Sequence, residues 1–234
     1  AAGYGDLCAT WTAPADWLLA HTLEMNPKYH PAPGLLLTDQ CRELLGRSAD
    51  LRRRDPEALM LLARVLTLSG LSMGIAGEST PCSGSEHLIS HLIDMSADAR
   101  GQQLCYHGAQ VSIGSILCCI AWHRFLTEFD PAKVDLDRCY PDAGAMRGMV
   151  LEGFRWLDGT GAAAEECWKD YEKKLAAWKA ARGAFERFLA HWDEFRAQAS
   201  ALVIPPEELC ARMAQAGAPK RFSQLTPSVD RKTA

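Results

Sequence analysis

The sequence has few signals for β-strands. It contains no long alternating run of Val, Ile and Thr bounded by Asn-Gly or Asp-Gly turns, which is the usual signature of a half-buried strand. It also has no Gly-Gly-Gly or Gly-x-Gly-x-x-Gly turn followed by a strand and a helix, the pattern of a dinucleotide-binding domain. We therefore expect an all-α chain that has no nucleotide-binding fold of its own.

Long apolar runs and clustered basic residues are also scarce. The longest uncharged apolar stretch, Val111 to Trp122, is shorter than the about 20 residues that cross a bilayer, so it predicts a buried helix. The one tight basic cluster, Arg52 to Arg54, falls where a helix is expected to end, and we interpret it as a solvated helix terminus. With a mild net charge of -4, the chain is expected to bind neither nucleic acid nor a membrane.

Neither a secretory leader nor a disulfide framework is recognisable. The nine cysteines are odd in number, Cys118 and Cys119 are adjacent inside an apolar run, and no Cys-x-x-Cys occurs. We interpret them as reduced, mostly buried thiols of a cytoplasmic protein. The chain begins with Ala and opens on a glycine-rich turn, which we take as the sign of a fragment.

Helical patterns recur throughout the chain. Apolar residues make up 48% of the sequence and charged residues 23%, the balance of a globular protein with a sizeable core. Helices are predicted over Gly5 to Leu23, Leu35 to Arg54, Pro56 to Ile75, Ser83 or Ser85 to Met95, His107 to Glu128, Ala143 to Leu157 and Pro206 to Ala216. Asp55 is the expected N-cap before Pro56, and a loop is expected from Asp158 to Gly161.

The longest periodic segment runs from Glu165 to Ala201. Its aromatic and leucine residues form one stripe, which predicts a single helix roughly 50 Å long. A coiled-coil dimer is one use of this stripe, but aromatic side chains make poor zipper knobs, so packing within the domain is favoured. We expect a helical domain over 1–204, followed over 205–234 by a short helix and a polar, disordered tail.

Three short motifs hold candidate metal ligands. They are Asp6 in "GYGDLC", His87 with His91 in "SGSEHLISH", and His107 in "YHGAQ". A catalytic metal ion usually takes three protein ligands from His, Asp or Glu. Residues four apart share one face of a helix, so His87 and His91 are a candidate pair, although packing explains such a pair as well. The spacing alone leaves the ligand set open.

Small residues surround these motifs. Gly3 and Gly5 flank Asp6 and permit a close backbone approach before the helix begins. Ser83, Gly84 and Ser85 precede His87, and their backbone N–H groups could receive an anion such as a phosphate. Simple N-capping by these serines is the alternative interpretation.

Four segments, in order, resemble the metal-binding helical half of sn-glycerol-1-phosphate dehydrogenases. They are "GYGDLCATWTAPADW", "SGLSMGIAGESTPCSGSEHLISHLIDM", "HGAQVSIGSI" and "PPEELCARMAQAGAP". This family belongs to the superfamily of iron-containing alcohol dehydrogenases, glycerol dehydrogenases and dehydroquinate synthases. The resemblance implies a multi-helix C-terminal domain, with the N-terminal α/β cofactor domain absent from this chain. It also implies NAD(P)H-linked reduction of dihydroxyacetone phosphate to sn-glycerol 1-phosphate, for phospholipid biosynthesis, with this chain inactive alone.

The resemblance also implies roles for particular residues. Asp6, His87 and His107 match the family's ligands for a divalent metal, with zinc expected and nickel or iron as alternatives. His91 matches a substrate-contacting residue and is the expected catalytic proton donor, and Asp6 is expected to touch the substrate as well. NAD or NADP would be bound mainly by the absent domain. The expected partner is a small phosphorylated ketone or polyol, and homo-oligomer formation is left open.

Two positions depart from the family pattern. Ser79-Thr80-Pro81 stands where the family often has Ser-Arg-Pro, and Ala109 stands where it often has Glu. Both changes leave the metal ligands intact and loosen the substrate assignment. The alternatives are a glycerol dehydrogenase or related polyol dehydrogenase, and a non-catalytic helical fragment in which the three ligands never meet. Dehydroquinate synthase is disfavoured because it has a glutamate in place of Asp6.

Overall fold

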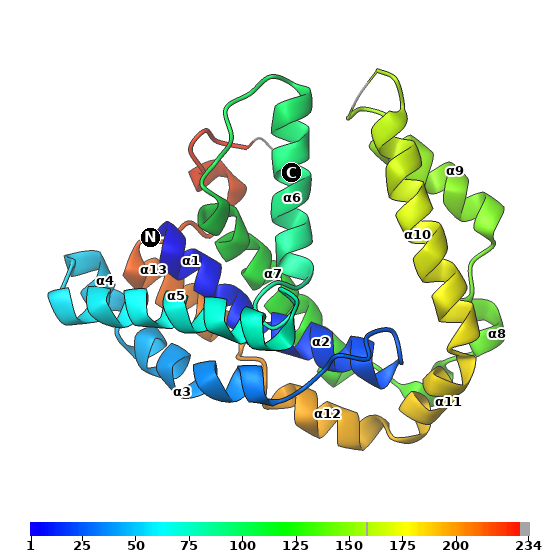
Figure 1. Ribbon diagram of the computed structural model, residues 1–234, viewed down its shortest axis with the longest axis horizontal. Coiled ribbons are helices and arrows are strands. Elements are labelled where there is room, and N and C mark those ends of the chain that lie inside the picture. Colours follow the sequence, from blue (N-terminus) through cyan, green and yellow to red (C-terminus); the bar gives the residue numbers. More distant parts are fainter. Residues whose placement is uncertain (158, 230–234) are drawn as a thin grey trace.

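In the computed structural model, which describes residues 1–157 and 159–229, every regular element is a helix (Figure 1). The all-α prediction is confirmed, and the predicted loop begins at Asp158, which lies outside the described residues. The elements are α1 (Ala2–Leu7), η1 (Cys8–Trp11), α2 (Ala13–Thr22), α3 (Ala32–Gly46), α4 (Ser48–Arg53), α5 (Pro56–Ala76), α6 (Ser85–Ala99), α7 (His107–Glu128), η2 (Pro131–Lys133), α8 (Leu136–Cys139), α9 (Ala143–Phe154), α10 (Ala162–Ala180), α11 (Arg182–Ala190), α12 (Trp192–Ser200), α13 (Pro206–Ala216) and η3 (Phe222–Gln224).

Helix α7 is the centre of the fold, and α1, α6 and α13 pack against it. Its bounds agree with the prediction, and most of the apolar run from Val111 to Trp122 is buried. The main core also includes Trp11, Leu44, Val65 and Met213, so it joins segments from both ends of the sequence.

A single continuous helix was predicted from Gly5 to Leu23, and this prediction is wrong. The chain forms α1, η1 and α2, and it leaves the helical region at Thr12, where φ is -136°. The Thr12 hydroxyl is buried and donates to Glu86 Oε2 at 2.7 Å, which holds the break in place. Similarly, the predicted helix from Leu35 to Arg54 is interrupted at Arg47, between α3 and α4.

The predicted single helix from Glu165 to Ala201 is also wrong. Three helices, α10, α11 and α12, follow one another with junctions at Ala181 and His191. The bends let the aromatic stripe curve around a second core, in which Trp192 lies 5.1 Å from Phe125 of α7 between ring centroids. The C-terminal part of the stripe therefore packs within its own chain, as favoured by the sequence.

Helices α9 and α10 pack side by side and stand apart from α6 (Figure 1). Helix α9 ends at Phe154, slightly before the predicted end at Leu157. Helix α13 has the predicted bounds, and its Leu209 and Met213 lie in the main core. The expected tail is partly ordered, since Ala218 and Leu225 are buried. The division at residues 204 and 205 stays a prediction.

Every cysteine is free, in agreement with the prediction. By length and composition alone, α5 and α7 could each cross a membrane. This is weak evidence, since the core helix of a soluble protein meets the same criterion. Within α7, 56% of the apolar window is buried inside the fold, compared with 28% within α5.

Candidate metal centre

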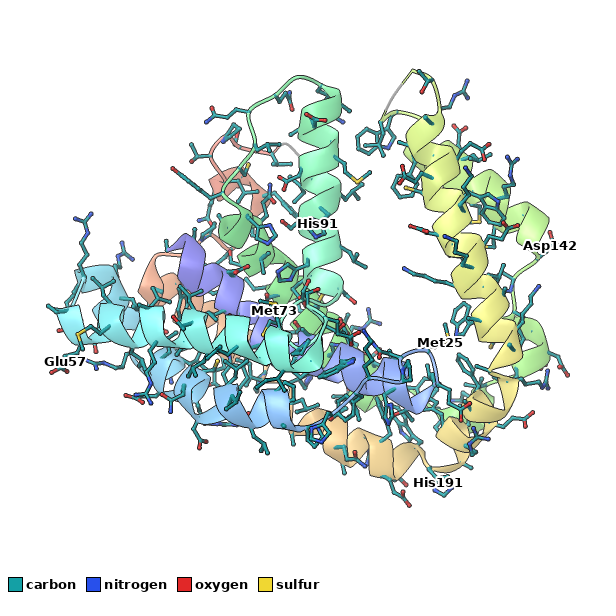
Figure 2. All side chains as sticks on the ribbon, viewed as in Figure 1. Met25, Glu57, Met73, His91, Asp142 and His191 are labelled. Atoms are coloured by element: carbon teal, nitrogen blue, oxygen red, sulfur yellow. The ribbon has the colours of Figure 1, made fainter. Side chains whose placement is uncertain are left out.

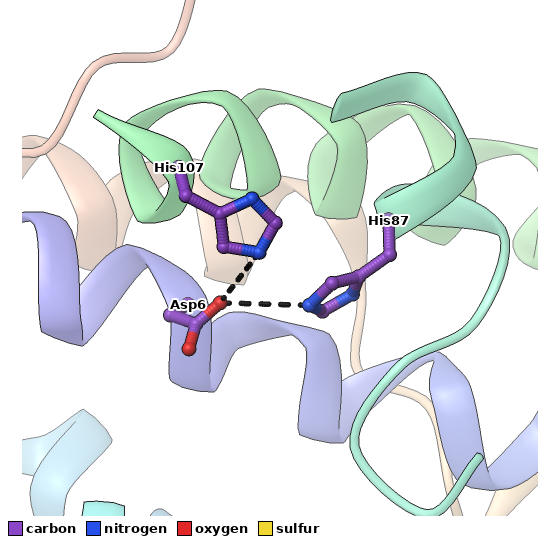
Figure 3. Close-up of side chains that lie close together, drawn as sticks. All are labelled: Asp6, His87 and His107. Atoms are coloured by element: carbon purple, nitrogen blue, oxygen red, sulfur yellow. Dashed lines mark ion pairs between the residues drawn. The ribbon is translucent and has the colours of Figure 1, made fainter. Parts of the chain in front are cut away.

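Three of the predicted site residues meet at the junction of α1, α6 and α7. Asp6 lies near the end of α1, His87 in the first turn of α6, and His107 is the first residue of α7. Asp6 Oδ1 lies 3.5 Å from His87 Nε2 and 3.6 Å from His107 Nε2 (Figure 3). One potential ligand atom from each residue lies within 4.8 Å of the other two. The alternative in which these side chains never meet therefore disagrees with the structure.

Close packing of α1 on α7 brings Asp6 to His107. A Cβ atom on Gly5 would collide with the carbonyl oxygen of Gly108, and one on Gly108 would collide with that of Ala2. Only glycine permits the two backbones to approach this closely. The predicted close backbone approach at Gly5 is confirmed, although Gly5 lies inside α1 and not before the helix.

A buried carboxylate orients His87. Glu86 is 0% exposed, and its Oε1 accepts a hydrogen bond from His87 Nδ1 at 2.9 Å and one from the Gly84 N–H at 2.5 Å. Its Oε2 accepts from the Thr12 hydroxyl. Because Glu86 occupies Nδ1, the imidazole presents Nε2 toward Asp6, an arrangement common among metal-binding histidines.

A hydroxyl holds the other imidazole. Ser90 Oγ lies 3.0 Å from His107 Nδ1 and 2.5 Å from Gln110 Oε1. Gln110 Nε2 in turn donates to Asp94 Oδ1 at 2.7 Å. His107 therefore also presents Nε2 to the site.

The two imidazoles differ in basicity. Burial alone would lower the pKa of His87, but the neighbouring carboxylates of Asp6 and Glu86 outweigh burial and raise the pKa to about 9. Burial lowers the pKa of His107, and the neighbouring His87 and His91 lower it further, against the opposing charge of Asp6. Without a metal, His87 thus holds a proton beside two carboxylates while His107 is neutral at pH 7.

The donor set fits a divalent metal ion. Asp6 Oδ1 is buried and has no hydrogen-bond partner within the described ranges. Buried carboxylate oxygens normally have partners, so an oxygen without one, facing two imidazole nitrogens, calls for a cation. Two imidazoles and one carboxylate are a usual ligand set of catalytic zinc, in which a further coordination position stays open.

His91 lies beside the three-residue group and is not part of it. It projects from α6 (Figure 2), with its ring centroid 6.4 Å from that of His87 and 5.9 Å from that of His107. The side chain is exposed. The pairing of His87 with His91 that spacing suggested is replaced by the pairing of His87 with His107.

In the turn before α6, two of the N–H groups suggested for an anion bind carboxylates instead. The Gly84 N–H donates to Glu86, and the Ser85 N–H donates to Asp16 Oδ2 at 2.6 Å. Two carboxylates beside this helix terminus would repel a phosphate. The predicted serine caps are also wrong, because Gly84 is the N-cap and no side chain caps α6.

Sequence reasoning missed Glu86, Gln110 and Asp94. Glu and Asp are almost never fully buried unless they are paired, so a helical pattern places them in solvent by default. The available signal was the position of Glu86 directly before His87 and after two small residues. No periodicity indicated that its carboxylate turns inward.

Curated proteins are similar to this chain over about half of its length. Glycerol-1-phosphate dehydrogenase (NAD(P)+) of Korarchaeum cryptofilum is 38% identical over 115 residues, which are 49% of this chain and 36% of the relative. The protein of the same name from Halorubrum lacusprofundi is 41% identical over 117 residues, 50% of this chain and 32% of the relative. That of Caldivirga maquilingensis is 33% identical over 116 residues, 50% of this chain and 33% of the relative.

The resemblance to glycerol-1-phosphate dehydrogenases is confirmed. The chain covers about a third of the length of these relatives. No family model matches the chain.

Proposed function

We propose that this chain is the metal- and substrate-binding part of an NAD(P)-linked glycerol-1-phosphate dehydrogenase. The reaction is the interconversion of dihydroxyacetone phosphate and sn-glycerol 1-phosphate. The observation that carries the proposal is the convergence of Asp6, His87 and His107, with Asp6 Oδ1 buried between two imidazoles and without a hydrogen-bond partner in the described residues. The relatives that share half of the chain carry this activity in their names.

Asp6, His87 and His107 would hold one divalent metal ion, with zinc expected and nickel or iron as alternatives. Such an ion acts as a Lewis acid that polarises a carbonyl oxygen. Glu86 and Ser90 keep the two imidazoles in place by occupying their Nδ1 atoms. The chain's own part in the chemistry is thus to hold two imidazole Nε2 atoms and one carboxylate oxygen in position at a partly buried site.

His91 is the proposed proton donor and substrate-binding residue. Its exposed ring is stacked near His107, with 5.9 Å between the ring centroids. Imidazole is the side chain that most readily exchanges a proton near neutral pH, so His91 can supply the proton that a reduced carbonyl oxygen takes up. Asp6 would contact the substrate in addition to its role as a ligand.

The nicotinamide is proposed to bind mainly outside this chain, since no Gly-rich nucleotide turn is present in the sequence. A cytoplasmic location and a role in phospholipid synthesis belong to the same proposal. The substrate is a small phosphorylated ketone or polyol.

The proposal is tested by assaying the full-length protein with dihydroxyacetone phosphate, with glycerol, and with both reduced and oxidised nicotinamides. Oxidation of NADH or NADPH that depends on dihydroxyacetone phosphate and is abolished by a chelator is the expected result. Turnover of glycerol in preference to the phosphorylated substrate would favour the alternative, a glycerol or polyol dehydrogenase. Absence of any turnover by metal-loaded protein would overturn the enzyme assignment.

A further inference from the structure

A chain of hydrogen bonds runs from His107 to a carboxylate on the next turn of α6. Ser90 lies between His107 and Gln110, and Gln110 lies between Ser90 and Asp94. Ser90 and Gln110 are both 0% exposed, so water does not compete for the contact between them, while the contacts with His107 and Asp94 are partly buried. Asp94 is partly exposed and is not among the three grouped ligands.

The Asp94 carboxylate determines which group donates and which accepts in each of these three hydrogen bonds. A carboxylate only accepts, so the amide NH₂ of Gln110 must face Asp94 and its carbonyl oxygen must face Ser90. The Ser90 hydroxyl has one hydrogen, and it donates that hydrogen to the carbonyl oxygen. Ser90 can therefore only accept from His107, whose proton must lie on Nδ1.

This tautomer is the one that a metal site needs. A neutral imidazole with its hydrogen on Nδ1 has its lone pair on Nε2. Nε2 of His107 is the nitrogen that lies 3.6 Å from Asp6 Oδ1. His87 is held by the Glu86 carboxylate directly, whereas Nδ1 of His107 is paired with the neutral hydroxyl of Ser90.

We propose that Asp94 is a positioning residue which, through Gln110 and Ser90, fixes the metal-binding tautomer of His107. The inference rests on the proposed metal role of the site. Its structural basis is the order of three hydrogen bonds that end on an obligate acceptor.

Replacement of Asp94 by Asn removes the constraint on direction. An Asn side chain donates as well as accepts, so the Gln110 amide is free to turn its NH₂ toward Ser90. Ser90 then donates to Nδ1 of His107, and the ring proton moves to Nε2. A protonated Nε2 faces the site and blocks a metal ion.

The tautomer is measured directly by long-range ¹H–¹⁵N NMR on the metal-free chain at pH 8, which lies above the ordinary imidazole pKa of about 6.5. The wild-type chain is expected to show hydrogen on Nδ1 of His107. Asp94→Asn is expected to show a mixture of tautomers. The matched control Asp98→Asn removes an exposed carboxylate one turn further along α6 and is expected to match the wild type. A wild-type ring with hydrogen on Nε2, or an unchanged ring in Asp94→Asn, would overturn the proposal.

Zinc titration of the same chains supplies a second readout. Loss of an outer hydrogen-bond partner typically weakens metal binding about 10- to 100-fold, and this is expected for Asp94→Asn and for Ser90→Ala. Ser96→Ala removes a buried hydroxyl of α6 that has no partner in the described structure, and it is expected to bind zinc like the wild type.

The double variant distinguishes an effect of Asp94 that passes through Gln110 and Ser90, here called the relay, from a direct effect of its charge on the metal site. If Asp94 acts through Ser90, Asp94→Asn with Ser90→Ala binds zinc no more weakly than Ser90→Ala alone. Additive losses would contradict the relay. A wild-type chain that binds no zinc would contradict the proposed function, while the NMR comparison would still decide the tautomer inference.

Discussion

The carbonyl oxygen of Ala2 occupies the space that a Cβ atom on Gly108 would need. This contact between α1 and α7 fixes how near Asp6 can lie to His107. The metal centre therefore depends on a backbone contact as much as on its ligands.

Gly108→Ala is expected to lower the free energy of unfolding by about 2–3 kcal/mol, because overpacking against rigid backbone forces the helices apart. Zinc affinity should fall with it. Gly70→Ala is the matched control, since a Cβ there meets nothing within 4 Å, and it should stabilise α5 by about 0.5–1 kcal/mol. Urea unfolding compares the two variants, and equal stabilities would contradict the close-packing account.

His91→Ala is expected to keep about one zinc ion per chain while turnover of the full-length protein falls, because His91 lies outside the three-residue ligand group. His107→Ala should lose both the bound zinc and the turnover. Elemental analysis of purified variants measures the metal. Loss of zinc from His91→Ala would make His91 a ligand and refute the proposed division of roles.

Trp192→Ala is expected to cost about 3–5 kcal/mol of unfolding free energy, because its ring is 5% exposed and packs in the second core. Trp178→Ala makes the same chemical change on α10, where the ring is 37% exposed, and should cost much less. Chemical denaturation measures both. A similar loss for the two variants would indicate that the bends after α10 do not serve the second core.

Thiol labelling should depend on burial and pH. Burial raises the pKa of Cys82 and of Cys119 to about 12, so only roughly one thiol in ten thousand is ionised at pH 8. Because the thiolate is the nucleophile, the exposed Cys139 should react with a maleimide first, and labelling of the buried pair should rise with pH. Mass spectrometry of labelled peptides checks this. Equal labelling of Cys119 and Cys139 at pH 8 would contradict it.

Helix ends with strong local signals were predictable. Helix α13 begins at Pro206 and is followed by Gly217 at positive φ, and Asp55 caps α5 as expected. The breaks at Thr12, Arg47, Ala181 and His191 were not predictable, because apolar spacing continues through each of them. Tertiary contacts with α6 and α7 determine where Thr12 and Trp192 must lie.

The candidate site was predictable only in part. The resemblance gave Asp6, His87 and His107, whereas spacing alone left the ligand set open, with His87 and His91 as a candidate pair. Nothing in the local pattern revealed that Glu86 turns inward or that Asp94 connects to His107. Such contacts depend on the angle between α6 and α7, which a linear pattern does not contain.

The most direct test of the account is anomalous diffraction at the zinc absorption edge from crystals of the zinc-loaded chain. We predict one ion bound by Asp6, His87 Nε2 and His107 Nε2 at about 2 Å, with His91 outside the ligand set. An ion bound elsewhere, or bound by His91 in place of His107, would contradict it.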